Sequence, residues 1–535
     1  MSLKLAAAQI NLWVGDIPGN VDRMVAAAAA ARDEHGADLV VFPELSLIGY
    51  PPDDLLLRSG MPAAVAAGVA RLEQEIRGIR AVVGLPEFDG ERIYNAAFVV
   101  GDGATHARYR KQCLPSYGVF DEHRHYTAGD RACVVDIAGT RVGLSICEDI
   151  WFEAPARRAA EAGAELLVNI NASPFDTGKS AQRERTLATR ARETGLPIVY
   201  VNCVGGQDEL VFDGDSRAVD GQGRTRFRAE AFRERVYAVD LDGEPSAAAA
   251  GSDADPVART YRGLVTAIRD YGDRNGFPGA LLGLSGGIDS ALVAALACDA
   301  LGPERVWTVS LPSRYTAGMS NDDAQEQAEL LGCRYDRIPI EPSVAAVSES
   351  LSGLFAGREP DLTEENLQSR CRGLMLMALS NKFGHLLLAT GNKSEMAVGY
   401  ATLYGDMAGG FAPIKDVYKT TVYELARYRN DIGRVIPERV ITRPPSAELR
   451  DDQQDSDSLP DYALLDAVLS AYVEEQCSID QIVARGYDAA EVRRIAALVR
   501  RSEYKRRQAP PGPKITARAF GRDRRYPITA VYGDL

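Results

Sequence analysis

The chain has 535 residues, of which 46% are hydrophobic and 25% are charged. At roughly 150 residues per domain, this length allows three or four domains or two large ones, and the composition excludes global disorder. The formal net charge of −14 argues against attraction of the whole surface to nucleic acid or to an anionic membrane.

Neither a membrane span nor a secretory leader is expected. The longest charge-free stretch, residues 275–288, contains Pro278 and several glycines, and a spanning helix needs roughly 18 to 20 apolar residues. The first ten residues lack a basic region followed by a long apolar core, so they predict a strand. The eight cysteines include no C-x-x-C pair, which disfavours a disulfide scaffold or a structural zinc site and predicts a cytoplasmic setting.

The first half of the chain alternates short apolar runs with longer segments of helical period, from Leu3 to about Val239. Asn20 is expected to cap an Ala-rich helix that ends near Gly36. We expect strands in the apolar runs, which are 39–42, 81–85, 96–100, 141–146, 166–170 and 198–201. This pattern predicts a layered α/β domain, which we assign to residues 1–245.

A stretch poor in large apolar residues follows, and we predict a linker over residues 246–258. The second domain, 259–535, then begins. We expect its helices at 257–275, 290–301, 322–331 and 366–383, and its strands at 280–284, 306–311, 335–340 and 385–390. Strands that alternate with helices form βαβ units, so this domain predicts a parallel sheet.

Three polar side chains follow apolar runs of the first domain: Glu44, Lys111 and Cys147. Taken singly, a cysteine at a strand end is usually a small buried hydrophobe, and a lone lysine or glutamate is usually a surface charge. Together they offer a nucleophile, a base and a cation. The ammonium can favour the thiolate and steady an oxyanion, and the glutamate can accept the thiol proton.

The segments around these residues are similar to the three motifs of the nitrilase (carbon-nitrogen hydrolase) superfamily. They read FPEL at Glu44, KxxLP followed by YGVFDE after Lys111, and ICEDIW at Cys147. The resemblance covers residues 3–240 and implies a four-layer αββα sandwich. It implies that Glu44 is the base, Lys111 the oxyanion stabiliser and Cys147 the nucleophile of a thioester reaction that releases ammonia.

The same resemblance implies further site residues. Glu122, in FDE, matches a fourth, supporting carboxylate of the superfamily. In its glutamine-using branch, Tyr117, Ser173 and Lys179 stand where contacts to L-glutamine are expected.

The sequence LSGGIDS, residues 284–290, joins an expected strand to an expected helix. Glycines there suit a tight turn by themselves, but the turn also aims backbone amides and a helix N-terminus at an anion such as phosphate. The loop lacks the lysine of G-x-x-x-x-G-K-[ST], which excludes that P-loop. Asp289 would repel a phosphate unless Mg²⁺ lay between them.

This loop resembles the pyrophosphate loop of N-type ATP pyrophosphatases, and downstream segments resemble the NAD synthetase family. These segments are NLQSRCR (366–372), ATGNKSE (389–395), YGDMAGGFAPIKDVYKT (404–420), PPSAELR (444–450) and SEYKRRQ (502–508). The two domains in one chain resemble the glutamine-dependent branch of that family. The implied fold of the second domain is a doubly wound parallel sheet.

The resemblance implies three groups of residues in the second domain. ATP contacts are expected from Ser285, Gly286, Gly287, Ser290, Thr390 and Lys419. Mg²⁺ is expected on Asp289 and Glu395, and deamido-NAD contacts are expected from Asn366, Arg370, Glu395 and Lys505. One position departs from the ammonia-only enzymes, because Leu403 stands here before Tyr404-Gly405-Asp406 where those enzymes carry a lysine.

The implied activity is ATP-dependent amidation of deamido-NAD with ammonia from glutamine. An enclosed passage for ammonia would keep it neutral and raise its effective concentration. The alternatives are another glutamine-fed adenylating ligase and a protein that only senses glutamine and ATP. The family resemblance also implies a homo-oligomer. The Arg-rich run from Arg493 to Arg525 fits a solvated face, a subunit contact or dinucleotide phosphates better than nucleic acid.

Overall fold

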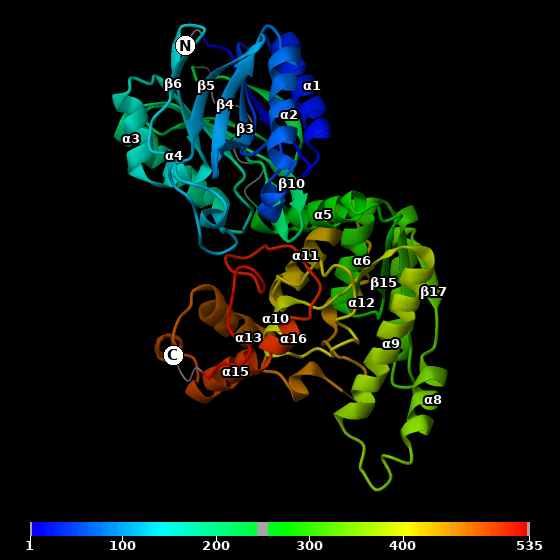
Figure 1. The fold of residues 1–535 in the computed structure, drawn as a ribbon. Helices are drawn as coiled ribbons and strands as arrows, with labels where there is room; N and C mark the ends of the chain where they lie inside the picture. The colour runs from blue at the N-terminus through cyan, green and yellow to red at the C-terminus, as the bar shows by residue number, and fades with distance from the viewer. Residues whose placement is uncertain (1–2, 243–254, 452, 532–535) are drawn as a thin grey trace. The chain divides into compact units, whose positions relative to one another are not determined.

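The computed structural model describes residues 3–242, 255–451 and 453–531. Its chain divides into two compact units, Met1–Asp255 and Pro256–Leu535 (Figure 1). Most of the expected linker, 246–258, lies outside the described residues, and its last residues already belong to the first helix of the second unit. In the part of the chain that the structure describes, no helix combines the length and apolar character that crossing a bilayer requires.

The first unit is built on two six-stranded sheets. One sheet has the order β14-β1-β2-β3-β4-β5 and the other the order β13-β12-β9-β8-β7-β6. The strands of the first sheet are β1 (Leu5–Gln9), β2 (Leu39–Val41), β3 (Arg80–Asp89), β4 (Arg92–Gly101), β5 (Ala104–Arg110) and β14 (Arg235–Val239). Those of the second are β6 (Val134–Ile137), β7 (Thr140–Ile146), β8 (Leu166–Asn171), β9 (Ile198–Asn202), β12 (Arg217–Val219) and β13 (Thr225–Arg228). A separate hairpin pairs β10 (Val204–Gln207) with β11 (Leu210–Asp213).

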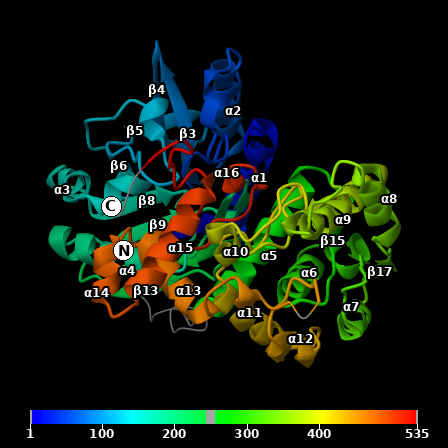
Figure 2. The ribbon, with the colours of Figure 1, turned by 90° about the horizontal axis from the view of Figure 1, so that it is seen from below.

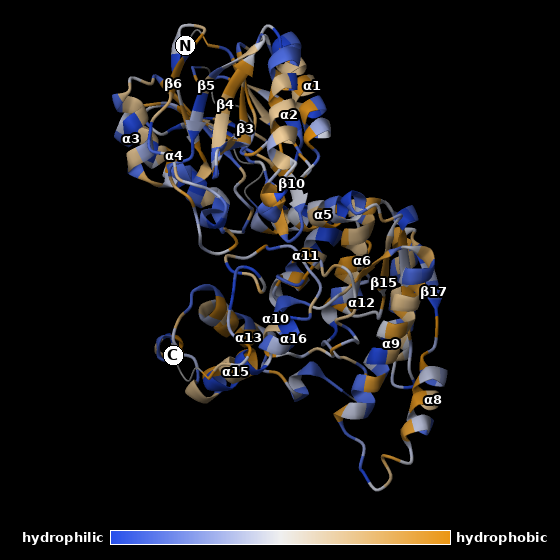
Figure 3. Cartoon of the chain, viewed as in Figure 1, coloured by the Kyte–Doolittle hydropathy of each residue, from blue (hydrophilic) through white to orange (hydrophobic). Residues whose placement is uncertain are grey.

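Helices cover the outer faces of these two sheets. They are α1 (Ile17–His35) and α2 (Met61–Glu75) on the first sheet, and α3 (Glu153–Glu161) and α4 (Lys179–Thr194) on the second. Residues of both sheets share one apolar cluster, which includes Val41, Val82, Leu144 and Val168. One further cluster lies between the first sheet and its helices, and another lies between the second sheet and its helices. Figure 3 shows the apolar strands lying inside. The expected four-layer αββα sandwich is confirmed.

One expected helix boundary is wrong. Helix α1 begins at Ile17, and its cap is Asp16, whose Oδ1 accepts a hydrogen bond from the amide of Gly19 at 3.1 Å. The earlier start is compatible with Pro18, because proline is well tolerated in a first helical turn. Asn20 is buried inside the helix, and its amide group donates to the carbonyls of Trp13 and Leu47.

The second unit contains one four-stranded parallel sheet of order β17-β16-β15-β18. The strands are β15 (Ala280–Gly283), β16 (Val306–Ser310), β17 (Arg334–Arg337) and β18 (Leu386–Leu388). Helices flank both faces, which confirms the doubly wound arrangement. They are α5 (Pro256–Arg274), α6 (Ile288–Leu301), α7 (Gly318–Leu331), α8 (Glu341–Leu351), α9 (Leu362–Phe383) and α11 (Lys419–Ile432).

The rest of this unit consists of shorter helices joined by loops (Figure 2), and several of these helices share their own apolar cluster. The helices are α10 (Lys393–Val398), α12 (Glu438–Thr442), α13 (Tyr462–Leu469), α14 (Ile479–Ala484), α15 (Ala489–Arg501) and α16 (Glu503–Arg506). The cluster joins α10 to α13, α14 and α15, so these helices hold one end of α10 in place.

Candidate active sites

The first unit brings Glu44, Lys111 and Glu122 into direct contact. Glu44 follows β2, Lys111 follows β5, and Glu122 begins a short 3₁₀ turn. The Nζ of Lys111 lies 2.7 Å from Oε1 of Glu44 and 2.8 Å from Oε1 of Glu122. All three side chains are buried. One ammonium therefore bridges two carboxylates in the interior.

Backbone and side-chain donors fix the Glu44 carboxylate. Its Oε1 also accepts from Nδ2 of Asn95 at 2.7 Å, and its Oε2 accepts from the amide of Ala172 at 2.9 Å. The amide of Glu44 in turn donates to the carbonyl of Asn171. Asn95, which no sequence motif marked, is thus part of the site. Its position in the middle of the apolar strand β4 is the signal that could have found it.

Cys147 stands where β7 gives way to a 3₁₀ turn over Cys147–Trp151. Its φ of +43° lies in the left-handed region, which is strained for a side chain of this kind. Asp149 holds the turn. Its Oδ2 accepts from the amide of Ile146 at 3.0 Å, and its Oδ1 accepts from the amide of Cys113 at 2.8 Å. This role of Asp149 was not predicted from the sequence.

The electrostatics of the cluster favour a resting thiol. Burial, together with the charge of Glu44, raises the pKa of Cys147 well above its ordinary value, and the opposing effect of Lys111 is smaller. Burial alone would lower the pKa of Lys111, but Glu122 and Glu44 outweigh it and hold that pKa well above the usual range. Lys111 does lower the pKa of Cys147, as expected, but burial and the charge of Glu44 raise that pKa by more.

Burial also raises the pKa of Glu122 to about 7, with Glu44 adding to the rise and Lys111 opposing it. Glu122 Oε2 is buried and has no hydrogen-bond partner among the described residues. Its Oε1 accepts from the hydroxyl of Tyr50 at 3.4 Å and from Lys111. This carboxylate is thus poised to change its charge near neutral pH.

The three expected glutamine contacts lie on segments beside the nucleophile. Tyr117 is half exposed, and its hydroxyl donates to Oε1 of Glu148, next to Cys147, at 3.0 Å. Lys179 begins α4, with its Nζ 4.5 Å from the ring centre of Trp151. Burial lowers the pKa of Lys179, while the charges of Cys147 and Glu148 raise it.

Ser173 lies two residues beyond β8 and is buried. Its amide donates to Oδ1 of Asn202 at 2.8 Å, and its hydroxyl accepts from Arg183 at 3.3 Å. It is joined to Glu44 through the neighbouring residue Ala172. The third expected contact thus belongs to the same stretch of chain that donates to the Glu44 carboxylate.

In the second unit, the glycine-rich loop joins β15 to α6 at the carboxyl edge of the parallel sheet. Gly286 has a φ of +80°, and a Cβ there would stand 2.3 Å from the carbonyl oxygen of Ser320. Only glycine fits this position. Ser290 closes the loop, because its hydroxyl accepts from the amide of Ser285 and donates to the carbonyl of Gly287.

A cavity of about 290 Å³ opens over this loop. The expected ATP and metal residues that line it are Ser285, Gly287, Asp289, Ser290, Thr390, Glu395 and Lys419. Gly286 belongs to the loop but does not line the cavity. Arg372 and Arg443 also line the cavity, and Nη2 of Arg443 donates to the carbonyl of Gly286 at 3.1 Å. Neither arginine was predicted as a site residue, although Arg372 ends the family-like segment NLQSRCR.

Asp289 and Glu395 share one cation in this cavity. Lys419 Nζ donates to the carboxylate of Asp289 and to Oε1 of Glu395, the latter at 3.2 Å. Asn392 links the Asp289 carboxylate to the backbone of Glu395: its Nδ2 donates to Oδ1 of Asp289, and its Oδ1 accepts from the backbone amide of Glu395, both at 3.0 Å. Burial raises the pKa of Glu395 to about 8. The positive charge of Lys419 lowers this pKa, and the negative charge of Asp289 raises it.

These oxygen ligands fit Mg²⁺, which binds proteins through one or two carboxylates together with substrate phosphates. Asp289 and Glu395 face the same cavity as the phosphate loop. Among the described residues, no cluster of three or more His, Cys, Asp or Glu side chains is arranged to hold a metal by itself. The carboxylate pair would therefore need phosphate oxygens to complete the coordination.

The other expected deamido-NAD residues gather around residues 399–406. Oδ1 of Asn366 accepts from the hydroxyl of Thr402, and Nε of Arg370 donates to the carbonyl of Leu403. Nζ of Lys505 donates to the carbonyl of Ala401 at 2.7 Å. Arg370 lines a second cavity of about 420 Å³, whose lining shares Gly373, Met407, Ala408, Ala509 and Pro510 with that of the first.

Two family models match the chain. Carbon-nitrogen hydrolase covers residues 4–249, and NAD synthase covers residues 260–509. A glutamine-dependent NAD(+) synthetase of Xanthomonas campestris is 53% identical over 99% of this chain and 98% of its own length. The chain belongs to the glutamine-dependent NAD(+) synthetase family.

Other members of this synthetase family are similar along the whole chain. The synthetase of Acinetobacter baylyi is 47% identical, with 98% of each chain covered. The structure of the synthetase of Acinetobacter baumannii, in complex with adenosine diphosphate, has a TM-score of 0.80 at 45% identity, with 98% of each chain covered. A synthetase from Cytophaga hutchinsonii shares the fold, with a TM-score of 0.84 at 22% identity over 99% of this chain and 98% of its own.

Proposed function

We propose that this chain makes NAD from deamido-NAD, ATP and L-glutamine. The observation that carries the proposal is the pair of preformed sites in one synthetase-family chain. One site is the buried Glu44–Lys111–Glu122 cluster beside Cys147. The other is the cavity over the phosphate loop, with Asp289, Glu395 and Lys419.

In the first site, the sulfur of Cys147 attacks the carboxamide carbon of glutamine. Because the thiol is protonated at rest, Glu44 has to accept its proton as the carbon–sulfur bond forms. The ammonium of Lys111 stabilises the oxyanion. The carbon–nitrogen bond then breaks, ammonia leaves with the proton from Glu44, and water hydrolyses the thioester to glutamate.

Tyr117, Ser173 and Lys179 are proposed to hold the rest of the glutamine molecule. Ser173 and Lys179 provide hydroxyl and ammonium donors near the nucleophile, which suits the carboxylate of an amino acid substrate, and the Tyr117 hydroxyl, which donates to Glu148, offers an acceptor. The nearby Glu148 accepts from Tyr117 and orients its hydroxyl. These positions agree with a substrate that has a side-chain amide and carries charged groups on its α-carbon.

In the second site, the nicotinate carboxylate attacks the α-phosphorus of ATP and pyrophosphate leaves. Ser285, Gly286, Gly287 and Ser290 provide the phosphate loop, and Thr390 and Lys419 line the same cavity. Arg372 and Arg443 add positive charge to its wall. The adenosine diphosphate named with the Acinetobacter baumannii relative supports nucleotide binding here.

Asp289 and Glu395 would hold Mg²⁺, which supplies charge neutralisation to the phosphates when bound. Asn392 ties the Asp289 carboxylate to the backbone of Glu395. Glu395 and the cluster of Asn366, Arg370 and Lys505 are proposed for deamido-NAD. Ammonia then attacks the adenylated carboxyl carbon, and AMP leaves.

Neutral ammonia has to reach the adenylate before it is protonated in bulk water, so we propose an enclosed route between the two reactions. An enzymatic ammonia trap in the solution tests this proposal. The rate of glutamine-fed NAD formation should be unchanged by the trap, whereas the rate with added ammonium chloride should fall.

A homo-oligomer in the cytoplasm completes the proposal. Large apolar side chains at Leu374, Met377 and Tyr404 are exposed beside the second cavity, which supports a contact with a second copy of this chain. The need for a free Cys147 thiol supports a reducing compartment. Light scattering of the full chain and of Leu374→Glu tests the oligomer. A glutamate in the contact between two copies should weaken that contact and so lower the measured mass of the assembly.

The activity test uses the full chain with ATP, Mg²⁺ and deamido-NAD, and either glutamine or ammonium chloride. NAD, AMP and pyrophosphate should form in equal amounts with both nitrogen donors. Formation of AMP without NAD, or no reaction with deamido-NAD, would contradict the proposed function.

A further inference from the structure

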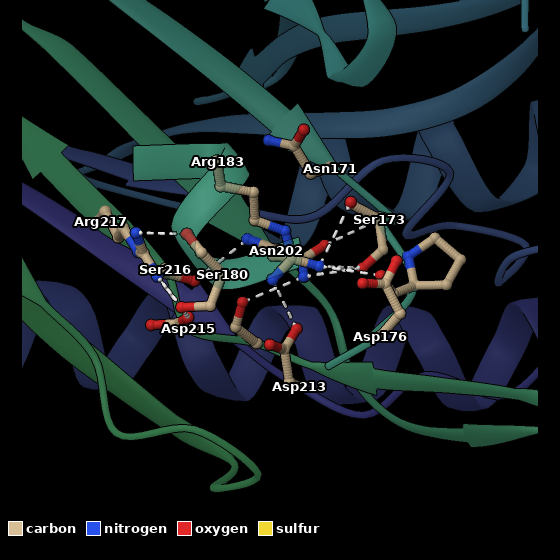
Figure 4. Close-up of polar contacts among 12 residues, drawn as sticks. Asn171, Ser173, Asp176, Ser180, Arg183, Asn202, Asp213, Asp215, Ser216 and Arg217 are labelled. Carbon is tan, nitrogen blue, oxygen red and sulfur yellow. Dashed lines mark hydrogen bonds and ion pairs between the residues drawn. The ribbon is translucent and has the colours of Figure 1, made fainter. Parts of the chain in front are cut away.

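A buried arginine lies behind the proposed glutamine site (Figure 4). Arg183 belongs to α4, where it shares the buried face with Leu187 and Ala191 at four-residue spacing. A position that the helix pattern reserves for an apolar side chain is thus occupied by a guanidinium. Its side chain is fully buried.

The guanidinium contacts the segment that carries Ser173. Nη2 of Arg183 donates to the carbonyl of Ser173 at 2.8 Å, to its hydroxyl at 3.3 Å and to the carbonyl of Pro174 at 3.1 Å. Nη1 donates to Oδ1 of Asp213, at the end of β11, at 2.7 Å. One charged side chain therefore fixes two successive carbonyls and one hydroxyl.

Asn202 completes this arrangement from the end of β9. It accepts from the amide of Ser173, and its Nδ2 donates to the carbonyls of Ser173 and Gly214 at 3.1 and 3.0 Å. On the other side of the segment, the amide of Ala172 donates to Glu44. The segment is therefore held between the catalytic carboxylate and the guanidinium of Arg183.

The chemistry of the contact sets the role of Ser173. Arg183 has donors only, so the Ser173 hydroxyl must accept this bond. Its own hydrogen remains for an acceptor, either the hydroxyl of the neighbouring Tyr200 or a substrate carboxylate. A buried ion pair is a poor device for stability alone, because the desolvation cost offsets much of the attraction. Arginine does offer a rigid fork of donors that a lysine cannot reproduce.

We infer that Arg183 is a positioning residue for glutamine, acting through Ser173 and anchored by Asp213. The inference rests on the proposed function of this site. It makes the affinity for glutamine, and not the chemistry at Cys147, the property that depends on Arg183.

The test compares Arg183→Lys with a matched control, Arg217→Lys, in the full chain. Arg217 is an equally buried arginine that pairs with Asp215, and it donates to the carbonyl of Ser180 without contacting Ser173. We expect Arg183→Lys to raise KM for glutamine by about tenfold or more, as expected for losing charged hydrogen bonds. Its kcat with glutamine and its rate with ammonium should stay near those of the wild type. Arg217→Lys should lower thermal stability without that change in KM.

A double-mutant cycle with Ser173→Ala tests the route of the effect. If Arg183 acts through Ser173, then Arg183→Lys should change KM little in the Ser173→Ala background. Should Arg183→Lys fail to fold, Asp213→Asn keeps the guanidinium but removes its anchor, and a several-fold rise in KM is expected.

An unchanged KM in folded Arg183→Lys, or effects that simply add in the cycle, would overturn the inference. The failure of the proposed function looks different, because the wild-type chain would then make no NAD from glutamine.

Discussion

Lys111 Nζ lies 2.7 Å from Oε1 of Glu44, and neither side chain is exposed. Glu122 holds the same ammonium from another direction at 2.8 Å. This arrangement leaves one net negative charge in the interior beside Cys147, which suits a base that must accept a proton from a buried thiol. It also makes the cluster sensitive to the loss of its cation.

Lys111→Met should abolish glutamine hydrolysis and lower the free energy of unfolding by about 3–5 kcal/mol, since two carboxylates would remain buried without a cation. Thermal and denaturant unfolding of the full chain measures the change. Adding Glu122→Gln to Lys111→Met should restore part of the stability, because one buried charge is removed. No recovery in the double variant would show that the loss has another cause.

Glutamine hydrolysis should decrease as the pH falls through about 7, the value to which burial raises the pKa of Glu122. Below that pH the folded protein keeps a proton on Glu122, so the carboxylate no longer holds Lys111 and no longer favours proton transfer to Glu44. Glutamate release over a pH series gives the profile. In Glu122→Gln this acidic limb should be lost, and an unchanged limb would assign it to another group.

Asp289→Asn should slow adenylation by about tenfold or more with either nitrogen donor, and should raise the Mg²⁺ concentration that the reaction needs, because one charged ligand is lost. Exchange of labelled pyrophosphate into ATP in the presence of deamido-NAD measures this step. The matched control is Asp299→Asn on the same helix, where the carboxylate pairs with Arg429 away from the cavity lining. Equal effects of the two variants would contradict the metal role.

Gly286→Ala should distort the phosphate loop, because the added Cβ meets the carbonyl of Ser320 and the φ of +80° disfavours a side chain. We expect a cost of about 1–3 kcal/mol in stability and a loss of ATP binding. Gly287→Ala is the control for stability, since its nearest contact is the movable Ser285 hydroxyl at 3.3 Å. Calorimetric unfolding with and without ATP distinguishes the two. A Gly286→Ala variant as stable as Gly287→Ala would contradict the argument.

Much of the fold followed from the sequence because hydrophobic period and strand–helix alternation are local signals. The expected strands at 81–85 and 141–146 lie within β3 and β7, and the parallel sheet of the second unit follows its βαβ pattern. The start of α1 was wrong because Asp16 competes successfully with Asn20 for the cap. Local sequence does not settle such a competition.

The candidate site was predictable where a short motif carries the residue. Glu44, Lys111 and Glu122 meet as their motifs indicate. The protonation of Cys147 was not predictable, because it depends on burial and on how Lys111 is shared. Arg183 and Asn95 were missed for a related reason. The role of a polar residue on an apolar face becomes clear only when its partners, which lie far away in the sequence, are known.

In the proposed reaction, Cys147 releases from glutamine the nitrogen that becomes the amide of NAD. Glutamine labelled with ¹⁵N at its amide, supplied to the wild type and to Cys147→Ala with ATP, Mg²⁺, deamido-NAD and unlabelled ammonium chloride, tests this by mass spectrometry of the NAD formed. The wild type should place the label in the amide, and Cys147→Ala should make NAD from unlabelled ammonium alone. Labelled NAD from Cys147→Ala would contradict the account.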